Sequence, residues 1–581
     1  MARKLPDSDF SVTMHKLALT GAFLRHVKHR TMKSTIATGR SSGPEKFGVP
    51  EILVWCALVT LCVAGHLFIT HGPLLRNDSY QYLSAAENFL AGRPAYTSIV
   101  YFDSERSAGR IPAPLTTFPA GFSLATSVVA ATGLPLQYSA LVVSVSALAL
   151  LIPVIVYAAR LLAIGTFLTR ALLIWFIGNS WVSVYGSAVA ADSLYMLMSS
   201  TALTLFATGM IRADARSPRV WPFIFGSLFV GLSYWVRYAG LFLFVSTAAF
   251  FAVRSLIVRD KASRNATLTL GLAAAIIGAG FLRNELLVGT WKGGNDKVVH
   301  HSVIAVLHDF IIWAHHLLLG GIASARFSWP ELVLAAGSLA TGAAIALRGR
   351  GARSARARLP WSERLGPSAL LLAYVAVYCA GMIYLGITSV ISFETRMFYP
   401  LLPPALLLLA RSLQLGEPAP HTASATRTMF FVGLSAATIG YLCIHDRSYF
   451  ASLGPAPHEL VARELSGVIS PGMTMQSWIA INIPADETII ANQGQASGYV
   501  LHRKTLALVS QQYSDQSWGD AAVHSVMQIY DAHFLILYSG DAADDVLHDS
   551  AFLSALAHGS PPSWLKLVAR SSGVAVFRVI T

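Results

Sequence analysis

Apolar runs of about 20 residues recur along this chain, and they constrain its fold more than any other feature. The first begins near Ile52, directly after a polar N-terminal stretch. A run of this length is what an α-helix needs to cross the hydrocarbon core of a bilayer. With 54% hydrophobic and only 13% charged residues, the chain is predicted to be a polytopic, α-helical membrane protein.

We expect eleven membrane-spanning helices within residues 51–445. Their expected ranges are 52–71, 137–159, 169–188, 192–211, 221–236, 238–253, 265–283, 329–347, 366–388, 397–412 and 426–444. The preceding segment, 1–50, is polar and basic and is expected to be a disordered cytoplasmic tail. A cleaved signal peptide is not expected, because the segment has no apolar core of the kind that such a peptide needs. An odd number of spans places the two termini on opposite sides of the membrane.

The basic residues of the loops indicate one orientation. Loops rich in arginine and lysine occur at 160–170, 212–219, 254–264 and 348–364. All of them fall on the side of the N-terminal tail if segments 119–133 and 304–320 are interfacial helices that do not cross. Because cytoplasmic loops carry the excess of positive charge, we expect a multi-pass inner (plasma) membrane protein with a cytoplasmic N-terminus. The net charge of +13 is then a property of these loops, and nucleic acid is not an expected partner.

Three segments are expected outside the membrane on the far side. They are the loops 72–136 and 284–328 and a C-terminal domain, 446–581. In that domain short β-rich runs at 488–492, 506–509, 534–538, 565–568 and 574–577 alternate with helical stretches near 457–467, 473–482 and 542–557. This alternation predicts a small extracytoplasmic α/β domain. The four cysteines of the chain lie inside apolar runs, which argues against a disulfide framework or a cysteine metal site.

Two acidic residues are expected at outer helix ends. Asp78 follows the first span and precedes a short amphipathic helix predicted over Ser79–Ala91, whereas Asp192 lies at the turn between two outward-pointing helix ends. Each residue could simply cap the helix that it begins. A helix N-terminus also keeps a carboxylate ionised, so that it can accept a proton from a bound hydroxyl group.

Two arginines are expected at the same membrane face. Arg237 divides a long apolar stretch into two spans, and Arg396 lies at another outer helix end. A cation at an outer turn runs against the positive-inside distribution, and this favours a bound anion. The alternatives are that Arg237 extends to the interface among aromatic residues and that Arg396 merely pairs with Glu394.

Two arginines and two carboxylates at one membrane face suit the transfer of a sugar from a lipid phosphate to a hydroxyl group. The arginines would stabilise the negative charge that grows on the departing phosphate. A carboxylate would accept the proton of the attacking hydroxyl. One base without a second nucleophile predicts a single displacement that inverts the anomeric centre. The scheme needs neither a metal nor another cofactor, because the arginines neutralise the phosphate.

Several stretches, in this order, resemble one family. They are Asn77-Asp-Ser-Tyr-Gln-Tyr82 and the rest of the segment to Gly92, Pro114-Leu-Thr-Thr-Phe-Pro-Ala-Gly-Phe122, Ala191-Asp-Ser-Leu-Tyr195, Arg237, Glu394-Thr-Arg-Met-Phe-Tyr-Pro400 and the segment 478–492. Over most of residues 50–510 the chain resembles a GT-C glycosyltransferase of the protein-mannosyltransferase and aminoarabinose-transferase superfamily.

The resemblance implies a polyprenyl-phosphate-linked sugar as donor and a glycan, lipid or protein as acceptor, in contact with membrane lipids. It matches Asp78 with the catalytic aspartate of the first loop and Asp192 with the second acidic position. It also matches Arg237 and Arg396 with the basic positions near the donor phosphate. The chain departs from many relatives at Asn77-Asp78, where they have Asp-Glu, and at Pro119-Ala120, where they have two prolines. These departures concern the acceptor more than the class of reaction.

Further substrate contacts are expected from Glu394, beside Arg396, and from His300 and His301 in the second outer loop. For the two histidines the alternative is an ordinary solvated loop surface.

Two other functional classes are compatible with a polytopic chain of this kind. A transporter or flippase of a lipid-linked glycan would also need arginines for the phosphate. It would be expected to carry polar residues or broken helices near the bilayer midplane, whereas the charges here gather at one face. A non-catalytic envelope assembly protein, with the C-terminal domain as its binding module, is the third alternative.

Overall fold

The computed structural model describes residues 47–102, 107, 109–212, 219–293, 299–319, 365–389, 394–415, 455–511, 513–559 and 561–580. Residues 47–581 form one compact unit, and residues 1–46 are assigned to another. Several expectations lie outside the described residues: most of the basic tail, the basic loop at 348–364, and the expected spans at 329–347 and 426–444.

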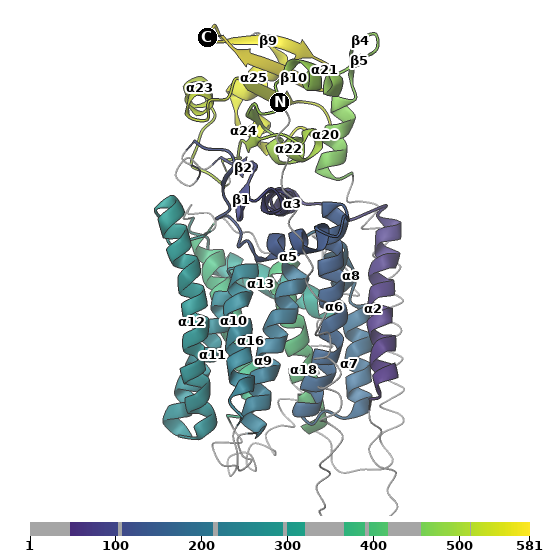
Figure 1. Cartoon of the computed structure of the whole chain (residues 1–581), viewed down its shortest axis with the longest axis vertical. Coiled ribbons are helices and arrows are strands. Elements are labelled where there is room, and N and C mark those ends of the chain that lie inside the picture. Colours follow the sequence, from purple (N-terminus) through teal and green to yellow (C-terminus); the bar gives the residue numbers. More distant parts are fainter. Residues whose placement is uncertain are drawn as a thin grey trace, which may run out of the picture. The chain divides into compact units, whose positions relative to one another are not determined.

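A bundle of long apolar helices forms the first part of the structure (Figure 1). Its helices are α2 (Val49–Ile69), α6 (Leu136–Leu161), α7 (Thr166–Gly178), α8 (Ser180–Ser187), α9 (Asp192–Arg212), α10 (Trp221–Val236), α11 (Gly240–Ile257), α12 (Lys261–Val288), α16 (Pro367–Thr388) and α18 (Leu402–Leu415). Six of them are long and apolar enough to cross a membrane, and a seventh span results if α7 and α8, bent by 54°, count as one. The polytopic helical architecture is therefore confirmed. The count of eleven spans is not confirmed within the described residues.

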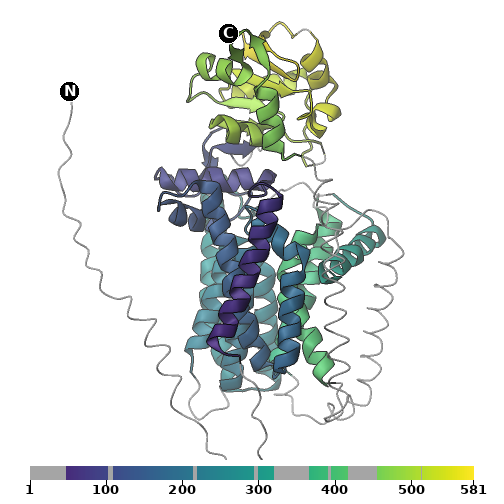
Figure 2. The ribbon, with the colours of Figure 1, turned by 90° about the vertical axis from the view of Figure 1, so that its right-hand side faces the viewer.

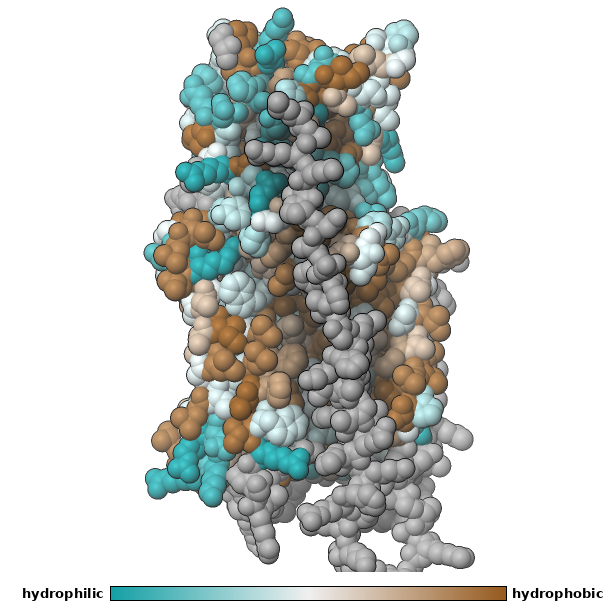
Figure 3. Space-filling model, in the orientation of Figure 1, coloured by the Kyte–Doolittle hydropathy of each residue, from teal (hydrophilic) through white to brown (hydrophobic). Residues whose placement is uncertain are grey.

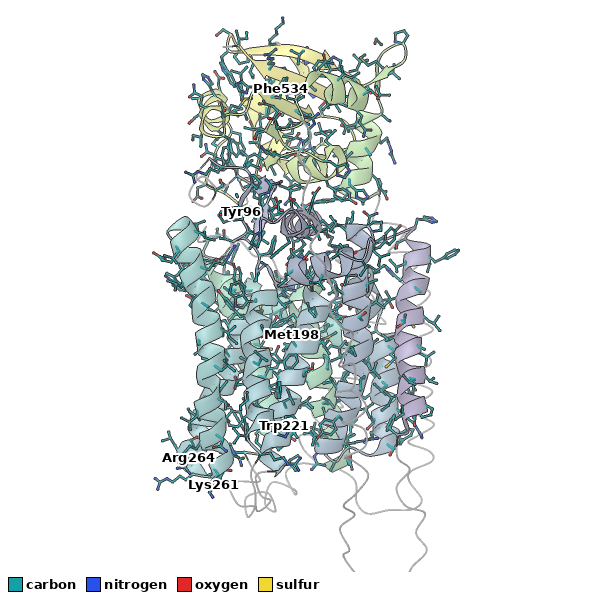
Figure 4. All side chains as sticks on the ribbon, viewed as in Figure 1. Tyr96, Met198, Trp221, Lys261, Arg264 and Phe534 are labelled. Atoms are coloured by element: carbon teal, nitrogen blue, oxygen red, sulfur yellow. The ribbon has the colours of Figure 1, made fainter. Side chains whose placement is uncertain are left out.

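The surface of this bundle is apolar along the helices and polar at their ends. On α12, for example, Leu268, Leu282 and Leu286 are exposed, and Figure 3 shows hydrophobic residues over much of the bundle on the face in view. Lys261 and Arg264, at the start of α12, lie at one end of the bundle, whereas Tyr96 lies at the other end (Figure 4). Such a broad apolar surface fits contact with lipid tails.

Three shorter helices accompany the bundle, and the sequence predicted each of them. α3 (Asn77–Leu90) occupies the helix expected at 79–91, and α5 (Gly121–Ala130) and α13 (Val303–Leu319) occupy the segments expected to be interfacial. α3 runs crosswise to the long helices rather than along them (Figure 2). It is amphipathic, and the residues that it buries include Tyr80 and Leu83.

A six-stranded sheet forms the second part of the structure, in the order β2-β7-β6-β8-β10-β9. Its strands are β2 (Ile99–Tyr101), β6 (Ile489–Ala491), β7 (Thr505–Ala507), β8 (Phe534–Tyr538), β9 (Leu565–Arg570) and β10 (Val574–Val579). β2, β7, β6 and β8 pair in parallel with one another. β10 pairs antiparallel with β8 on one side and with β9 on the other. All five β-rich runs expected in the C-terminal domain coincide with strands of this sheet.

Helices and two small antiparallel pairs complete this part. The helices are α20 (Pro457–Leu465), α21 (Met475–Asn482), α22 (Gly494–Leu501), α23 (Asp520–Ile529), α24 (Asp545–Asp549) and α25 (Ala551–His558). The small pairs join β1 (Tyr96–Thr97) to β3 (Ala113–Pro114) and β4 (Val468–Ser470) to β5 (Met473–Thr474). The alternation of helices and strands is therefore that of the expected α/β domain.

One strand of the sheet does not come from the C-terminal segment. β2 belongs to the loop between α2 and α5, and Val100 in β2 pairs with Leu506 in β7. Both side chains lie in one apolar core together with Ile490 and Leu535 of the next two strands. The sequence did not predict this strand, because three residues are too short to show a period of two. The first loop and the C-terminal domain thus share a sheet and a core.

This pairing predicts a specific cross-link. In the double variant Val100→Cys/Leu506→Cys, neighbouring strands would hold the two Cα atoms about 5 Å apart, within the range that a disulfide requires. We expect a disulfide under mild oxidation, seen as a reversible mobility shift on a non-reducing gel. The matched control Val100→Cys/Leu535→Cys places the thiols on strands that are not neighbours and should not cross-link. Equal cross-linking of both pairs, or of neither, would contradict the strand order.

Candidate active site

A short parallel bridge holds together the two backbone segments that carry the acidic candidates. The Leu74 N–H donates to the Ser187 carbonyl (3.0 Å), and the Val189 N–H donates to the Leu74 carbonyl (3.1 Å). The Ser79 hydroxyl, in the first turn of α3, donates to the Val189 carbonyl at 2.8 Å, across 110 residues of sequence. The beginnings of α3 and α9 are therefore held side by side, and these are the places of Asp78 and Asp192.

Asp78 forms an ion pair with Arg396. The Arg396 Nη1 atom lies 2.5 Å from Asp78 Oδ2, and the side chains are 21% and 20% exposed, so that solvent or a ligand can reach both. Arg396 belongs to the short helix α17 (Thr395–Phe398), which is followed by a 3-10 turn, η2 (Tyr399–Leu401). The Asp78 carboxylate is the main cause that raises the pKa of the Arg396 guanidinium. Arg396 is consequently a permanent cation.

A second carboxylate shares the same guanidinium. Glu394 Oε2 lies 3.0 Å from Arg396 Nε, and the Arg76 Nη1 atom approaches the same oxygen at 3.8 Å. Arg396 thus contacts one carboxylate through Nη1 and another through Nε. The simple pairing of Arg396 with Glu394 that the sequence left open is present, but it accompanies the contact with Asp78.

Asp192 forms the second ion pair, with Arg237. The Asp192 side chain is only 3% exposed, whereas that of Arg237 is 21% exposed. Arg237 is extended, with φ −146° and ψ 139°, and ends α10. The chain turns there into α11, and the Tyr238 hydroxyl donates to the Thr116 carbonyl at 2.7 Å. A contact with Asp192 accounts for this arginine better than extension to the interface does.

Tyr82 connects the two ion pairs. Its ring is buried and packs against Phe118 at 5.1 Å and Phe122 at 5.2 Å between ring centroids. Burial raises the pKa of its hydroxyl, Asp78 raises it further, and the two guanidinium groups of Arg237 and Arg396 oppose this rise. The charges of Asp78, Arg237 and Arg396 therefore act on one hydroxyl group.

The charges of the cluster also act on one tyrosine of the first loop and on one of the C-terminal domain. Desolvation raises the pKa of Tyr101 in β2, and Asp78 raises it further, while the amide of Gln495 in α22 acts in the opposite direction. Burial likewise raises the pKa of Tyr513, and among the carboxylates that raise it further are Glu394 and Asp78. The sequence offered no signal for these uncharged residues, because neither a motif nor a period marks them.

A small aromatic contact fixes α3 against the C-terminal domain. The Tyr80 hydroxyl lies 3.2 Å from His458 Nδ1 and accepts a hydrogen bond from the His458 N–H at 3.2 Å. The Tyr80 ring also packs on Tyr499 of α22, with 5.3 Å between centroids. The Tyr499 hydroxyl in turn donates to Gln137 Oε1 at 2.7 Å, at the start of α6. The helix that carries Asp78 is thus held from the bundle and from the domain.

The remaining expected site residues lie elsewhere or lack a described contact with the cluster. His300 and His301 are exposed, directly before α13. The His301 N–H donates to the Ile387 carbonyl at the end of α16 (3.0 Å), and no described contact joins either imidazole to the acids or arginines. Within the described residues, no group of three or more histidine, cysteine, aspartate or glutamate side chains is placed to hold a metal ion.

Comparison with known proteins identifies the fold. No protein-family model matches the chain, and no curated protein matches its sequence. Solved structures do match: ArnT from Cupriavidus metallidurans bound to undecaprenyl phosphate aligns with a TM-score of 0.51 and 13% identity, over 91% of this chain and 98% of that one. The chain has the GT-C fold. At the level of the fold, the resemblance expected from the sequence is therefore confirmed.

Two further GT-C structures support this assignment. The oligosaccharyltransferase of Archaeoglobus fulgidus in the apo form aligns with a TM-score of 0.51 and 13% identity, over 87% of this chain and 72% of that one. Arabinofuranosyltransferase AftD from mycobacteria aligns with a TM-score of 0.52 and 13% identity, over 92% of this chain. The chain spans 40% of the length of AftD. At this level of identity the comparisons establish the fold.

The buried pair of Asp192 and Arg237 predicts a stability effect that depends on both partners. Asp192→Leu would leave the guanidinium without its carboxylate, which typically costs about 3–5 kcal/mol of unfolding free energy. We therefore expect a clear fall in the thermal unfolding temperature of the purified protein in detergent. The double variant Asp192→Leu/Arg237→Met, with two apolar side chains of suitable size, should recover most of the loss. A single variant as stable as the parent would contradict the ion pair.

Proposed function

We propose that the protein is a membrane glycosyltransferase that moves a sugar from a polyprenyl-phosphate donor to a hydroxyl acceptor, with inversion of the anomeric centre. The observation that carries the proposal is the contact of 2.5 Å between Asp78 and Arg396, next to a second acid–arginine pair in a GT-C fold. The structure of ArnT with undecaprenyl phosphate makes a polyprenyl phosphate the natural donor carrier to propose.

The mechanism begins with an exchange of partners at Arg396. An anionic donor phosphate would compete with Asp78 for the guanidinium, since Arg–phosphate contacts are charge-assisted and bidentate. The released Asp78 carboxylate then accepts the proton of the acceptor hydroxyl. The acceptor oxygen bonds to the anomeric carbon while the bond from this carbon to the phosphate oxygen breaks. The electron pair leaves with the phosphate, where Arg396 and Arg237 stabilise the added negative charge.

The neighbouring residues would prepare Arg396 for this role. Glu394 holds the Nε side of the guanidinium at 3.0 Å, which leaves Nη1 directed at Asp78 and at an incoming phosphate. Asp192, buried beside Arg237, would orient the second guanidinium in the same way. His300 and His301 are proposed as contacts of the acceptor or of the donor sugar from the neighbouring loop. The scheme uses no metal or other cofactor.

The proposed orientation places the site outside the cytoplasm. Lys261 and Arg264 lie at the opposite end of the bundle from Tyr96 (Figure 4), and basic residues favour the cytoplasmic side. The N-terminus would then be cytoplasmic, with the site and the C-terminal domain on the far side of an inner (plasma) membrane. Transport of a lipid-linked glycan is the second function to test, because it would use the same arginines.

Replacement of the base tests the chemistry. With purified protein in detergent and a polyprenyl-phosphate sugar donor, we expect Asp78→Asn to lower the turnover about 10²–10⁴-fold, the range typical of a lost general base. Release of polyprenyl phosphate measures the reaction. Donor binding should persist, since both arginines remain. The matched control is Asp531→Asn, at an exposed turn of the C-terminal domain, which should leave turnover unchanged.

The same assay distinguishes the alternatives. A transporter or an assembly protein with the Asp78→Asn change would keep its activity, because neither needs a base. Unchanged sugar transfer by Asp78→Asn would therefore contradict the assignment of Asp78, and the absence of donor consumption by the parent protein would contradict glycosyl transfer itself.

A further inference from the structure

An uncharged polar pocket adjoins the proposed base. It lies between α3, β2 and the segment at 113–117, and its lining includes Gln81, Thr97, Tyr101 and Thr116. None of the lining residues that the structure describes is charged. Gln81 follows Asp78 by three positions on α3, and side chains at this spacing share one side of a helix. The pocket is therefore one helical turn from the carboxylate.

One amide oxygen in the lining of this pocket is buried without a hydrogen-bond partner among the described residues. Gln81 is only 1% exposed, and its Oε1 atom has no hydrogen-bond partner among the described residues. Gln495 is 5% exposed, and its amide acts on the Tyr101 hydroxyl through a side-chain hydrogen bond. A buried polar atom left without a partner costs about 1–3 kcal/mol. A ligand hydroxyl group that donates a hydrogen bond to Gln81 Oε1 would remove this cost.

Tyr101 links the pocket to the charged cluster. It lines the pocket beside Gln81, and the charges of Asp78 and Arg396 and the amide of Gln495 all act on its hydroxyl. A molecule that contacts Gln81 and Tyr101 would thus have its edge next to the carboxylate that is to accept a proton.

We propose that this pocket receives an edge of the acceptor, and that the acceptor is a neutral saccharide, one hydroxyl group of which donates a hydrogen bond to the Gln81 amide oxygen. The proposal rests on the glycosyltransferase function proposed above. Sugar hydroxyls donate hydrogen bonds, so one of them can satisfy the carbonyl oxygen of Gln81. An acceptor with a phosphate group would bring an anion against described lining residues that include no cation, which is unfavourable.

A site built in this way discriminates strongly. Buried groups that are paired by a substrate hydroxyl become unpaired with an analogue that lacks it, and rejection follows from that cost. The charged cluster and the neutral pocket would accordingly separate two tasks. Arg237 and Arg396 would hold the anionic donor, and Gln81 and Tyr101 would hold the uncharged acceptor.

The test compares acceptors and variants in one assay. Purified protein receives undecaprenyl-phosphate-linked hexose and pentose donors with a neutral oligosaccharide, a threonine-containing peptide or a phosphorylated glycolipid. We expect transfer to the neutral oligosaccharide. In Gln81→Leu we expect the acceptor KM to rise about 10–100-fold, as for the loss of one or two buried hydrogen bonds, with an unchanged KM for the donor. Tyr101→Phe, which removes only a hydroxyl group, should shift the acceptor KM in the same direction.

A structural role for Gln81 would give a different result. Because its Oε1 atom has no partner in the described structure, Gln81→Leu should not lower the thermal unfolding temperature. Gln528→Leu, at an exposed position of α23, is the matched control and should change neither KM. A fall in stability with an unchanged acceptor KM would overturn the acceptor role.

The outcomes separate this inference from the proposed function. Consumption of none of the donors would overturn the glycosyltransferase assignment and the acceptor pocket with it. Transfer only to the peptide or only to the phosphorylated glycolipid would support the glycosyltransferase and overturn the neutral acceptor. An effect of Gln81→Leu and Tyr101→Phe on the donor KM alone would assign the pocket to the donor sugar instead.

Discussion

The ion pair between Asp78 and Arg396 is the interaction on which the site depends. Its partners are 318 residues apart in the sequence, and each is at the beginning of a helix that the bundle holds in place. In a partly desolvated setting two opposite charges attract several times more strongly than in water. The pair therefore keeps two opposite charges together at the site, and in the proposed mechanism an anionic donor replaces the carboxylate at the guanidinium.

The sheet of the C-terminal domain gives this ion pair its rigid surroundings. The edge of β7 would expose unpaired backbone groups, and β2 of the first loop covers it. α3 leads through a short loop into β2, so that pairing at the sheet also limits the movement of Asp78. The contacts of Tyr80 with His458 and Tyr499 act on the same helix. The C-terminal domain therefore contacts both α3 and β2, the elements next to Asp78.

Charge is distributed around the site in two unlike halves. Arg76, Arg237 and Arg396 lie at or near helix ends, together with their carboxylate partners. The Gln81 amide and the Tyr101 hydroxyl lie on the side of the pocket. A reaction between an anionic lipid carrier and a neutral hydroxyl compound needs this division. In the proposed reaction, one half would neutralise phosphate, and the other would recognise a hydroxyl group without adding charge.

Local sequence determined most of the elements. Apolar length predicted α2, α6 and α16, and the run at 534–538 predicted β8 (Phe534–Tyr538), because burial over a whole helix or strand leaves a regular pattern. Local sequence did not show which of these elements contact each other. Tertiary structure alone paired Asp192 with Arg237 and Asp78 with Arg396, added β2 to the sheet, and buried the Gln81 amide beside a pocket. Ion pairs, a three-residue strand and a single amide depend on neighbours distant in sequence, and such contacts leave no periodic signal in the chain.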